Sequence, residues 1–186
     1  MTKQQERGKM FVGSILSLSL LTVMAGAAVA PALGVIRSYF IDCNPLLVQM
    51  IISIPAIFIV LTNFFFSKLC SKFGSKTLVL VGLAFYTIGG ILAGAFDHIG
   101  LVLVMRTLVG IGVGIIMPLS TGLLVFYFPP WRLSALMGYS SAMNQLGGVI
   151  ATLLSGLLAS ISWRASFLVY LLGLISIILC CFFLPN

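Results

Sequence analysis

Six apolar segments, each long enough to cross a lipid bilayer as a helix, fill this chain almost from end to end. About 20 apolar residues in helical form span the ~30 Å hydrocarbon core of a membrane. The runs are continuous and do not alternate at every second residue, so they predict helices and not barrel strands. The sequence therefore predicts an all-α membrane protein, one domain over residues 1–186, with spans at residues 10–36, 45–66, 77–96, 101–125, 133–160 and 165–184.

The composition agrees with lipid as the main solvent of the chain. Hydrophobic residues make up 61% of it and charged residues only 7%, whereas a soluble domain carries about a quarter charged residues. The net charge of +7 is explained by loop cations of a membrane protein, so no nucleic-acid partner is expected. No nucleophile–base pair, metal-ligand spacing or phosphate-binding loop is visible, so we expect no enzyme, no cofactor and no metal site.

The loop charges predict the orientation of the spans. Two cations, Arg37 and Arg164, fall on one side of the membrane, and Arg106 lies within a span. Cytoplasmic loops carry the excess of Lys and Arg, which predicts that both chain termini are cytoplasmic in a multi-pass protein of the plasma (inner) membrane. The seven cations on that side are Lys3, Arg7, Lys9, Lys68, Lys72, Lys76 and Arg132.

Prolines and small residues indicate where helices bend and pack. Pro31 and Pro118 lie in the first and fourth spans, and each removes a backbone hydrogen bond. Bent, glycine-rich helices in corresponding places of two three-helix units are typical of transporters and predict a three-plus-three inverted repeat. Residues four apart share one helix face, so small residues at this spacing predict close helix packing. Gly110 and Gly114 have this spacing in the fourth span, and the fifth span has two such rows, of which one contains Gly147 and the other Gly156.

Polar side chains inside the spans are the candidate functional residues. A charge near the middle of a transmembrane helix costs about 2.5–3.5 kcal/mol on insertion scales, so Arg106 is expected to have a role. It either biases a cavity toward anions or holds the first or fifth helix through backbone carbonyls. The amides of Asn144 and Gln145 in the fifth span, and of Gln49 and Asn63 in the second, are further candidates for a solute pathway.

The segment that follows the second span resembles a family motif. Residues 67–76 are similar to the G-x-x-x-D-R/K-x-G-R/K-R/K loop of the major facilitator superfamily (MFS). Lys72, Gly74 and Lys76 fit this pattern, whereas Ser71 stands where the family has an aspartate. The resemblance implies that the three matching residues belong to a cytoplasmic gating loop.

Three further matches spread the resemblance over most of the chain. Arg106 and Gly110 fit the arginine motif of the family's fourth helix, and residues 162–167 resemble its W-R-x-x-F segment before helix six. The fifth span is similar to the antiporter motif G-x8-G-x3-G-P-x2-G-G, although Thr152 replaces the proline. Three of its glycines fit that motif: Gly138, Gly147 and Gly156.

The chain thus resembles the amino-terminal six-helix half of a twelve-helix MFS transporter, close to the drug and metabolite antiporters. The resemblance implies transport of a small solute by alternating access, with lipid, the solute and a second six-helix half as partners. That half is expected to be a second copy or a separate chain, since this chain stops after the sixth span. The alternatives are an inactive fragment and a membrane scaffold. The only acids are Glu6, Asp42 and Asp97, all outside the spans, so no carboxylate proton relay is expected in this half.

Overall fold

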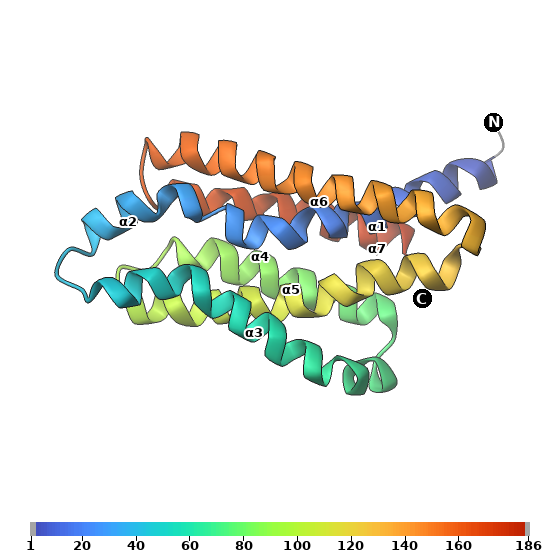
Figure 1. Ribbon diagram of the computed structural model, residues 1–186, viewed down its shortest axis with the longest axis horizontal. Coiled ribbons are helices and arrows are strands. Elements are labelled where there is room, and N and C mark those ends of the chain that lie inside the picture. The colour runs from blue at the N-terminus through green and yellow to red at the C-terminus, as the bar shows by residue number, and fades with distance from the viewer. Residues whose placement is uncertain (1–2, 185–186) are drawn as a thin grey trace.

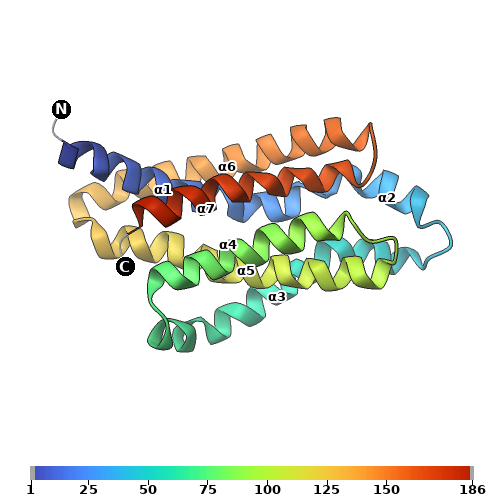
Figure 2. The same ribbon diagram turned by 180° about the vertical axis from the view of Figure 1, so that it is seen from behind.

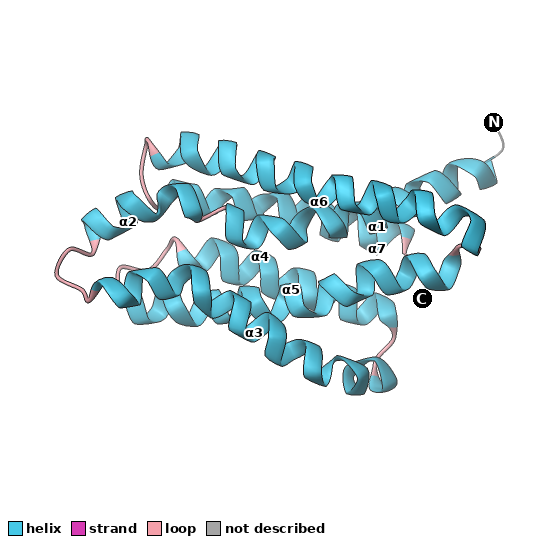
Figure 3. Ribbon diagram, viewed as in Figure 1, coloured by secondary structure: helices cyan, strands magenta, loops and turns pink. Residues whose placement is uncertain are grey.

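The computed structural model of the chain describes the backbone of residues 3–184 and the side chains from Met10 onward. Within this part every regular element is a helix and there is no strand, as Figure 3 shows. Six stretches are long and apolar enough to cross a membrane, which confirms the predicted all-α membrane fold. The elements are α1 (Lys3–Ala27), η1 (Ala30–Ala32), α2 (Leu33–Tyr39), α3 (Pro45–Lys72), α4 (Ser75–Ala93), α5 (Ile99–Tyr127), α6 (Pro130–Ala159), η2 (Ala165–Leu171) and α7 (Leu172–Phe183).

The first and last spans are less regular than predicted. The first span, predicted as one helix over 10–36, is divided into α1, the 3₁₀ turn η1 and α2. Pro31 lies within that turn and has no N–H to continue an α-helix. The last span begins with the 3₁₀ helix η2, and only its second part, α7, is α-helical.

The second span is longer than predicted, and the loop expected at residues 67–76 is mostly helical. Helix α3 continues to Lys72, and α4 already begins at Ser75. Only Phe73 and Gly74 connect the two helices. The side chains of Lys68 and Lys72 are exposed, so the last turn of α3 carries charge and extends past the apolar part of the span.

The six spans form two layers that run along the long axis of the molecule. The first span, α3, α5 and α6 are visible from the front, with α6 and α3 at the two edges (Figure 1). Helices α4 and α7 come to the front when the molecule is turned (Figure 2). Both marked chain ends lie at the same end of the bundle as the α3–α4 and α5–α6 connections.

The helix contacts follow an inverted three-plus-three repeat. Helix α1 packs on α6 as α5 packs on α3, and α7 lies against α1 as α4 lies against α5. Helices α1 and α5 also touch each other, as do α4 and α7. The apolar core lies mainly between α1, α4, α5 and α7, and α3 and α6 are the least buried spans.

Candidate functional site

Arg106 lies inside the bundle and is completely buried. Its Nε donates to the Ile51 carbonyl of α3 at 2.9 Å, and Nη2 donates to the Ala25 carbonyl of α1 at 2.8 Å. Its Nη1 donates to the hydroxyl of Tyr170 in η2, which in turn donates to Ala25 O at 2.8 Å. One guanidinium therefore joins three other spans through oxygen acceptors.

The partners of Arg106 are all neutral. The only ion pair in the described part of the chain joins Arg164 and Asp97, and neither residue is a hydrogen-bond partner of Arg106. The Tyr170 ring lies 5.7 Å from the guanidinium carbon and 5.0 Å from the ring of buried Tyr86. Arg106 was expected either to bias a cavity toward anions or to hold the first or fifth span through backbone carbonyls. In the structure it binds one carbonyl of the first span, that of Ala25. The other carbonyl that it binds, that of Ile51, belongs to α3 and not to the fifth span.

The two amides of α6 differ in their surroundings. Asn144 is half-buried, and its Oδ1 accepts from the Thr22 hydroxyl of α1 at 2.8 Å. One turn earlier on α6, the hydroxyls of Ser140 and Ser19 are 2.7 Å apart. Gln145 is exposed and lines a shallow depression of about 390 Å³ on the outer face of α6. Asn144 therefore holds α1 against α6, and Gln145 remains available to another molecule.

The amides of α3 are both exposed. Gln49 lines an open cavity of about 360 Å³ between α2 and the start of α3, and Arg37 lies in the same wall. Asn63 lies 14 residues further along α3 with its side chain exposed. Gln49, Asn63 and Gln145 are thus on the two least buried spans, whereas Arg106 and Asn144 face the bundle interior.

The glycines predicted at helix contacts fall into two groups. A Cβ added at Gly147 would collide with the Leu20 carbonyl of α1, and one added at Gly110 would lie 2.6 Å from the Pro55 carbonyl of α3. A Cβ at Gly114 would lie 2.7 Å from Thr62 of α3. By contrast, Gly138 has open space around it, and the nearest atom to a Cβ at Gly156 is 3.9 Å away.

Of the prolines expected to bend helices, Pro31 lies at the break in the first span, whereas α5 remains one continuous helix through Pro118. The expected gating residues lie in and beside the short α3–α4 connection. Lys72 is the last residue of α3, Gly74 precedes the first residue of α4, and Lys76 lies in the first turn of α4.

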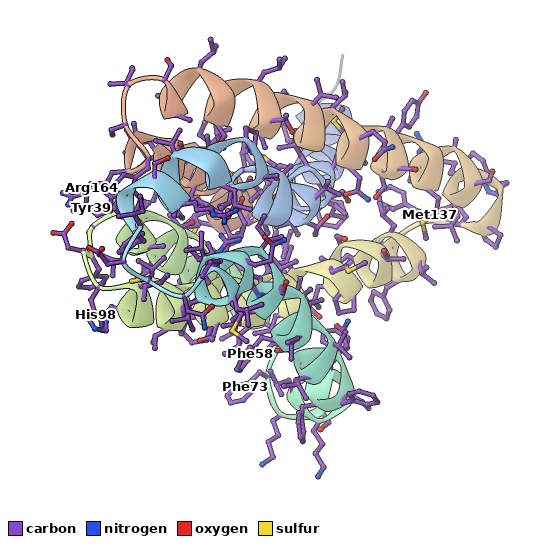
Figure 4. The ribbon with its side chains drawn as sticks, turned by 60° about the vertical axis from the view of Figure 1, so that its left-hand side comes forward. Tyr39, Phe58, Phe73, His98, Met137 and Arg164 are labelled. Carbon is purple, nitrogen blue, oxygen red and sulfur yellow. The ribbon has the colours of Figure 1, made fainter. Side chains whose placement is uncertain are left out.

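A polar cluster at the opposite end of the bundle was not singled out from the sequence. Arg164 forms an ion pair with Asp97, and the Tyr39 hydroxyl donates to Asp97 Oδ1 at 2.7 Å. The Arg164 guanidinium carbon is 5.5 Å from the Trp163 ring. Figure 4 shows Tyr39 and Arg164 next to each other, with His98 at the same end. The cluster links the ends of three spans that are distant in sequence. No sequence pattern predicted it, because Asp97 and Arg164 lie in separate loops.

The Asp97 carboxylate is stabilised by its neighbours. The Tyr39 hydroxyl, and after it the Arg164 guanidinium, hold the pKa of Asp97 below its usual range. The same Tyr39 and Asp97 contacts raise the pKa of Arg164. Both groups are exposed, so water and salt weaken the pair.

Comparison with known proteins gives one family. The family model of the Major Facilitator Superfamily matches residues 11–186. The chain is 31% identical over 100 residues to Multidrug resistance protein 3 of Bacillus subtilis (strain 168), covering 53% of this chain and 20% of that protein. It is 25% identical over 141 residues to Riboflavin transporter RibZ of Clostridioides difficile (strain 630), and this match covers 75% of this chain and 31% of that protein.

A further relative is Quinolone resistance protein NorA of Staphylococcus aureus (strain N315), which is 25% identical over 114 residues. This match covers 61% of this chain and 29% of that protein. The matches thus span between a fifth and a third of these relatives. The relatives are drug and metabolite transporters and not enzymes, which agrees with a bundle of six apolar helices and a buried arginine. The chain belongs to the Major Facilitator Superfamily.

Proposed function

We propose that this chain is the amino-terminal half of a secondary transporter that moves a small organic solute across the plasma membrane by alternating access. The observation that carries the proposal is the exposure of the amides of Gln49, Asn63 and Gln145 on the membrane-spanning helices α3 and α6. Lipid cannot hydrogen-bond to an amide, so such side chains are costly at a lipid-facing surface. A second six-helix half facing α3 and α6, with a water-filled path between the halves, gives these amides partners.

The lengths of the relatives support this arrangement. Each matched relative extends well beyond the matched stretch, so it has room for a second bundle of similar size. In this proposal the partner is a second six-helix half. Gln49, in the wall of the α2–α3 cavity, and Gln145, on the outer face of α6, then border the solute pathway. Arg106 acts from behind this pathway, through the helices that it joins.

In the same proposal the termini are cytoplasmic, and the α3–α4 connection is part of the cytoplasmic gate. The exposed Lys72, together with Gly74 and Lys76, would contact the partner half when that side closes. The relatives' names point to drug-like or vitamin-like organic solutes. An inactive fragment or a scaffold is the competing function and predicts no flux under any condition.

The test is solute uptake into proteoliposomes under an imposed pH gradient, with riboflavin and ethidium as fluorescent probes. The 186-residue chain is reconstituted at densities that give either monomers or dimers, and also together with a carboxy-terminal six-helix half of a relative. We expect no flux from monomers and measurable flux from one of the paired forms, with Gln145→Leu lowering it several-fold. Flux from a monomer contradicts the half-transporter proposal, and no flux in any form favours the inactive alternative.

A further inference from the structure

Both backbone carbonyls that bind Arg106 lack their usual helical partners. In an unbroken helix, the carbonyl of residue i accepts the N–H of residue i+4. For Ile51 that residue is Pro55, which has no N–H to donate. For Ala25 it is Val29, whose N–H bonds to the Gly26 carbonyl at 3.3 Å where α1 ends. Arg106 therefore donates to two buried acceptors that receive no i+4 hydrogen bond from their own helix.

The register between α5 and α3 explains why Arg106 reaches the Ile51 carbonyl. Gly110, one turn after Arg106, lies against Pro55, one turn after Ile51; a Cβ at Gly110 would be 2.6 Å from the Pro55 carbonyl and 2.9 Å from its Cα. This close approach is open only to glycine. Arg106 and Gly110 in α5 thus have the same four-residue spacing as the Ile51 carbonyl and Pro55 in α3.

Tyr170 completes this arrangement from the last span. Its hydroxyl accepts a hydrogen bond from Arg106 and donates one to Ala25 O at 2.8 Å, and its side chain is completely buried. Its ring packs directly against Gly90 of α4, which leaves the ring little freedom to move. The phenol therefore fixes the guanidinium in the pose that reaches both carbonyls.

We propose that Tyr170 is a positioning residue for Arg106, and that the two form a joint that holds the break in α1 against the proline site in α3. The joint lies where α1 gives way to η1 and α2, and α2 forms one wall of the cavity that contains Gln49. The angle between α1 and α2, and hence the width of this cavity, depends on the joint. This inference rests on the contacts alone and does not require that the chain transports a solute.

Tyr86 provides a matched control. It is a completely buried tyrosine beside Tyr170, but among the described residues its hydroxyl has no hydrogen-bond partner. In the full chain in lipid nanodiscs, Tyr170→Phe should speed amide exchange of residues 26–32 by about tenfold, as expected when a buried hydrogen bond to a charged group is lost. Tyr86→Phe should leave this exchange within about twofold of the unchanged protein. Equal effects of the two variants overturn the proposal.

A double-mutant cycle tests whether Tyr170 acts through Arg106. Residues of one network are non-additive, so Arg106→Lys combined with Tyr170→Phe should exchange hardly faster than Arg106→Lys alone. Strictly additive effects overturn the proposal.

A second variant keeps the test decisive if Tyr170→Phe does not fold. Pro55→Ala supplies an N–H to the Ile51 carbonyl, so this carbonyl no longer depends on Arg106. The increase in exchange caused by Arg106→Lys should then be smaller in the Pro55→Ala background than in the unchanged protein. The same increase in both backgrounds overturns the proposal.

Discussion

At the scale of single residues, the same kind of side chain has different roles according to what it faces. Asn144 and Gln145 are neighbours in the sequence, yet Asn144 bonds to Thr22 of α1 and Gln145 is exposed on the outer face of α6. Successive residues of a helix point about 100° apart, so neighbours seldom share one environment. A polar residue in a span is thus either internal structure or an outward contact, and only its neighbours decide between these.

This difference leads to a prediction for the two amides. Asn144→Leu removes the α6 partner of the Thr22 hydroxyl, which also bonds to the Ser19 carbonyl of its own helix. The loss of this bond between helices should lower the free energy of unfolding by roughly 0.6–2 kcal/mol, the range for hydrogen bonds between membrane helices. Gln145→Leu removes no side-chain hydrogen bond to any described residue and should have no such cost. Chemical denaturation of the two variants in mild detergent measures the difference. A larger loss for Gln145→Leu would contradict the assignment.

The cluster of Tyr39, Asp97 and Arg164 predicts a dependence on pH. The pKa of Asp97 is lowered by Tyr39 and then by Arg164, so the folded state favours the charged carboxylate. The stabilisation is present above the ordinary aspartate pKa of 3.8 and is lost as the pH falls from there through the lower folded value. The unfolding temperature of the unchanged protein should therefore exceed that of Asp97→Asn at pH 7, and the gap should close as the pH falls below 3.8 and through the lower folded pKa. A gap that does not change with pH would show that Asp97 acts without its charge.

At the scale of helices, small residues matter only where two backbones approach each other. Helix α1 approaches α6 so closely at Gly147 that a Cβ would collide with the Leu20 carbonyl. Gly138, on the same helix and part of the same sequence motif, has open space around it. The motif marks both positions, but the packing uses them differently.

These two glycines allow a matched comparison. Gly147→Ala should separate α1 from α6 and destabilise the bundle by about 1–3 kcal/mol, the usual cost of overpacking. Gly138→Ala should be neutral or stabilise α6 by up to about 1 kcal/mol, because alanine is the better helix former. Thermal unfolding followed by circular dichroism distinguishes the two variants. Similar losses at both sites would show that the α1–α6 contact is looser than described.

At the scale of the whole molecule, the connections separate into two sets at opposite ends of the bundle. The marked chain ends and the α3–α4 and α5–α6 connections share one end, and the polar cluster at Tyr39 and Arg164 lies at the other (Figures 1 and 4). The lysines near the α3–α4 connection are therefore on the side of the termini. Positive loops favour the cytoplasm, which supports the proposed orientation.

Two natural cysteines test this orientation. Cys43 lies in the connection between α2 and α3, and Cys70 is exposed near the end of α3, at the opposite end of the span. A membrane-impermeant maleimide added outside intact cells should label Cys43 and spare Cys70. Permeabilised cells serve as the control and should label Cys70 as well. Labelling of Cys70 alone in intact cells would reverse the orientation.

The sequence by itself determined the class of fold, the number of spans and the family. These depend on the length and continuity of apolar runs and on local motifs, and lipid enforces helices wherever such runs occur. Span ends were less predictable, as at Lys72, because a helix can continue past the membrane when its exposed turns carry charge. The tertiary structure alone decided the roles within the bundle. Arg106 forms hydrogen bonds to Tyr170 and to the carbonyls of Ala25 and Ile51 because three other spans converge on it. Such contacts depend on the register and distance between helices that are far apart in sequence, which no local pattern records.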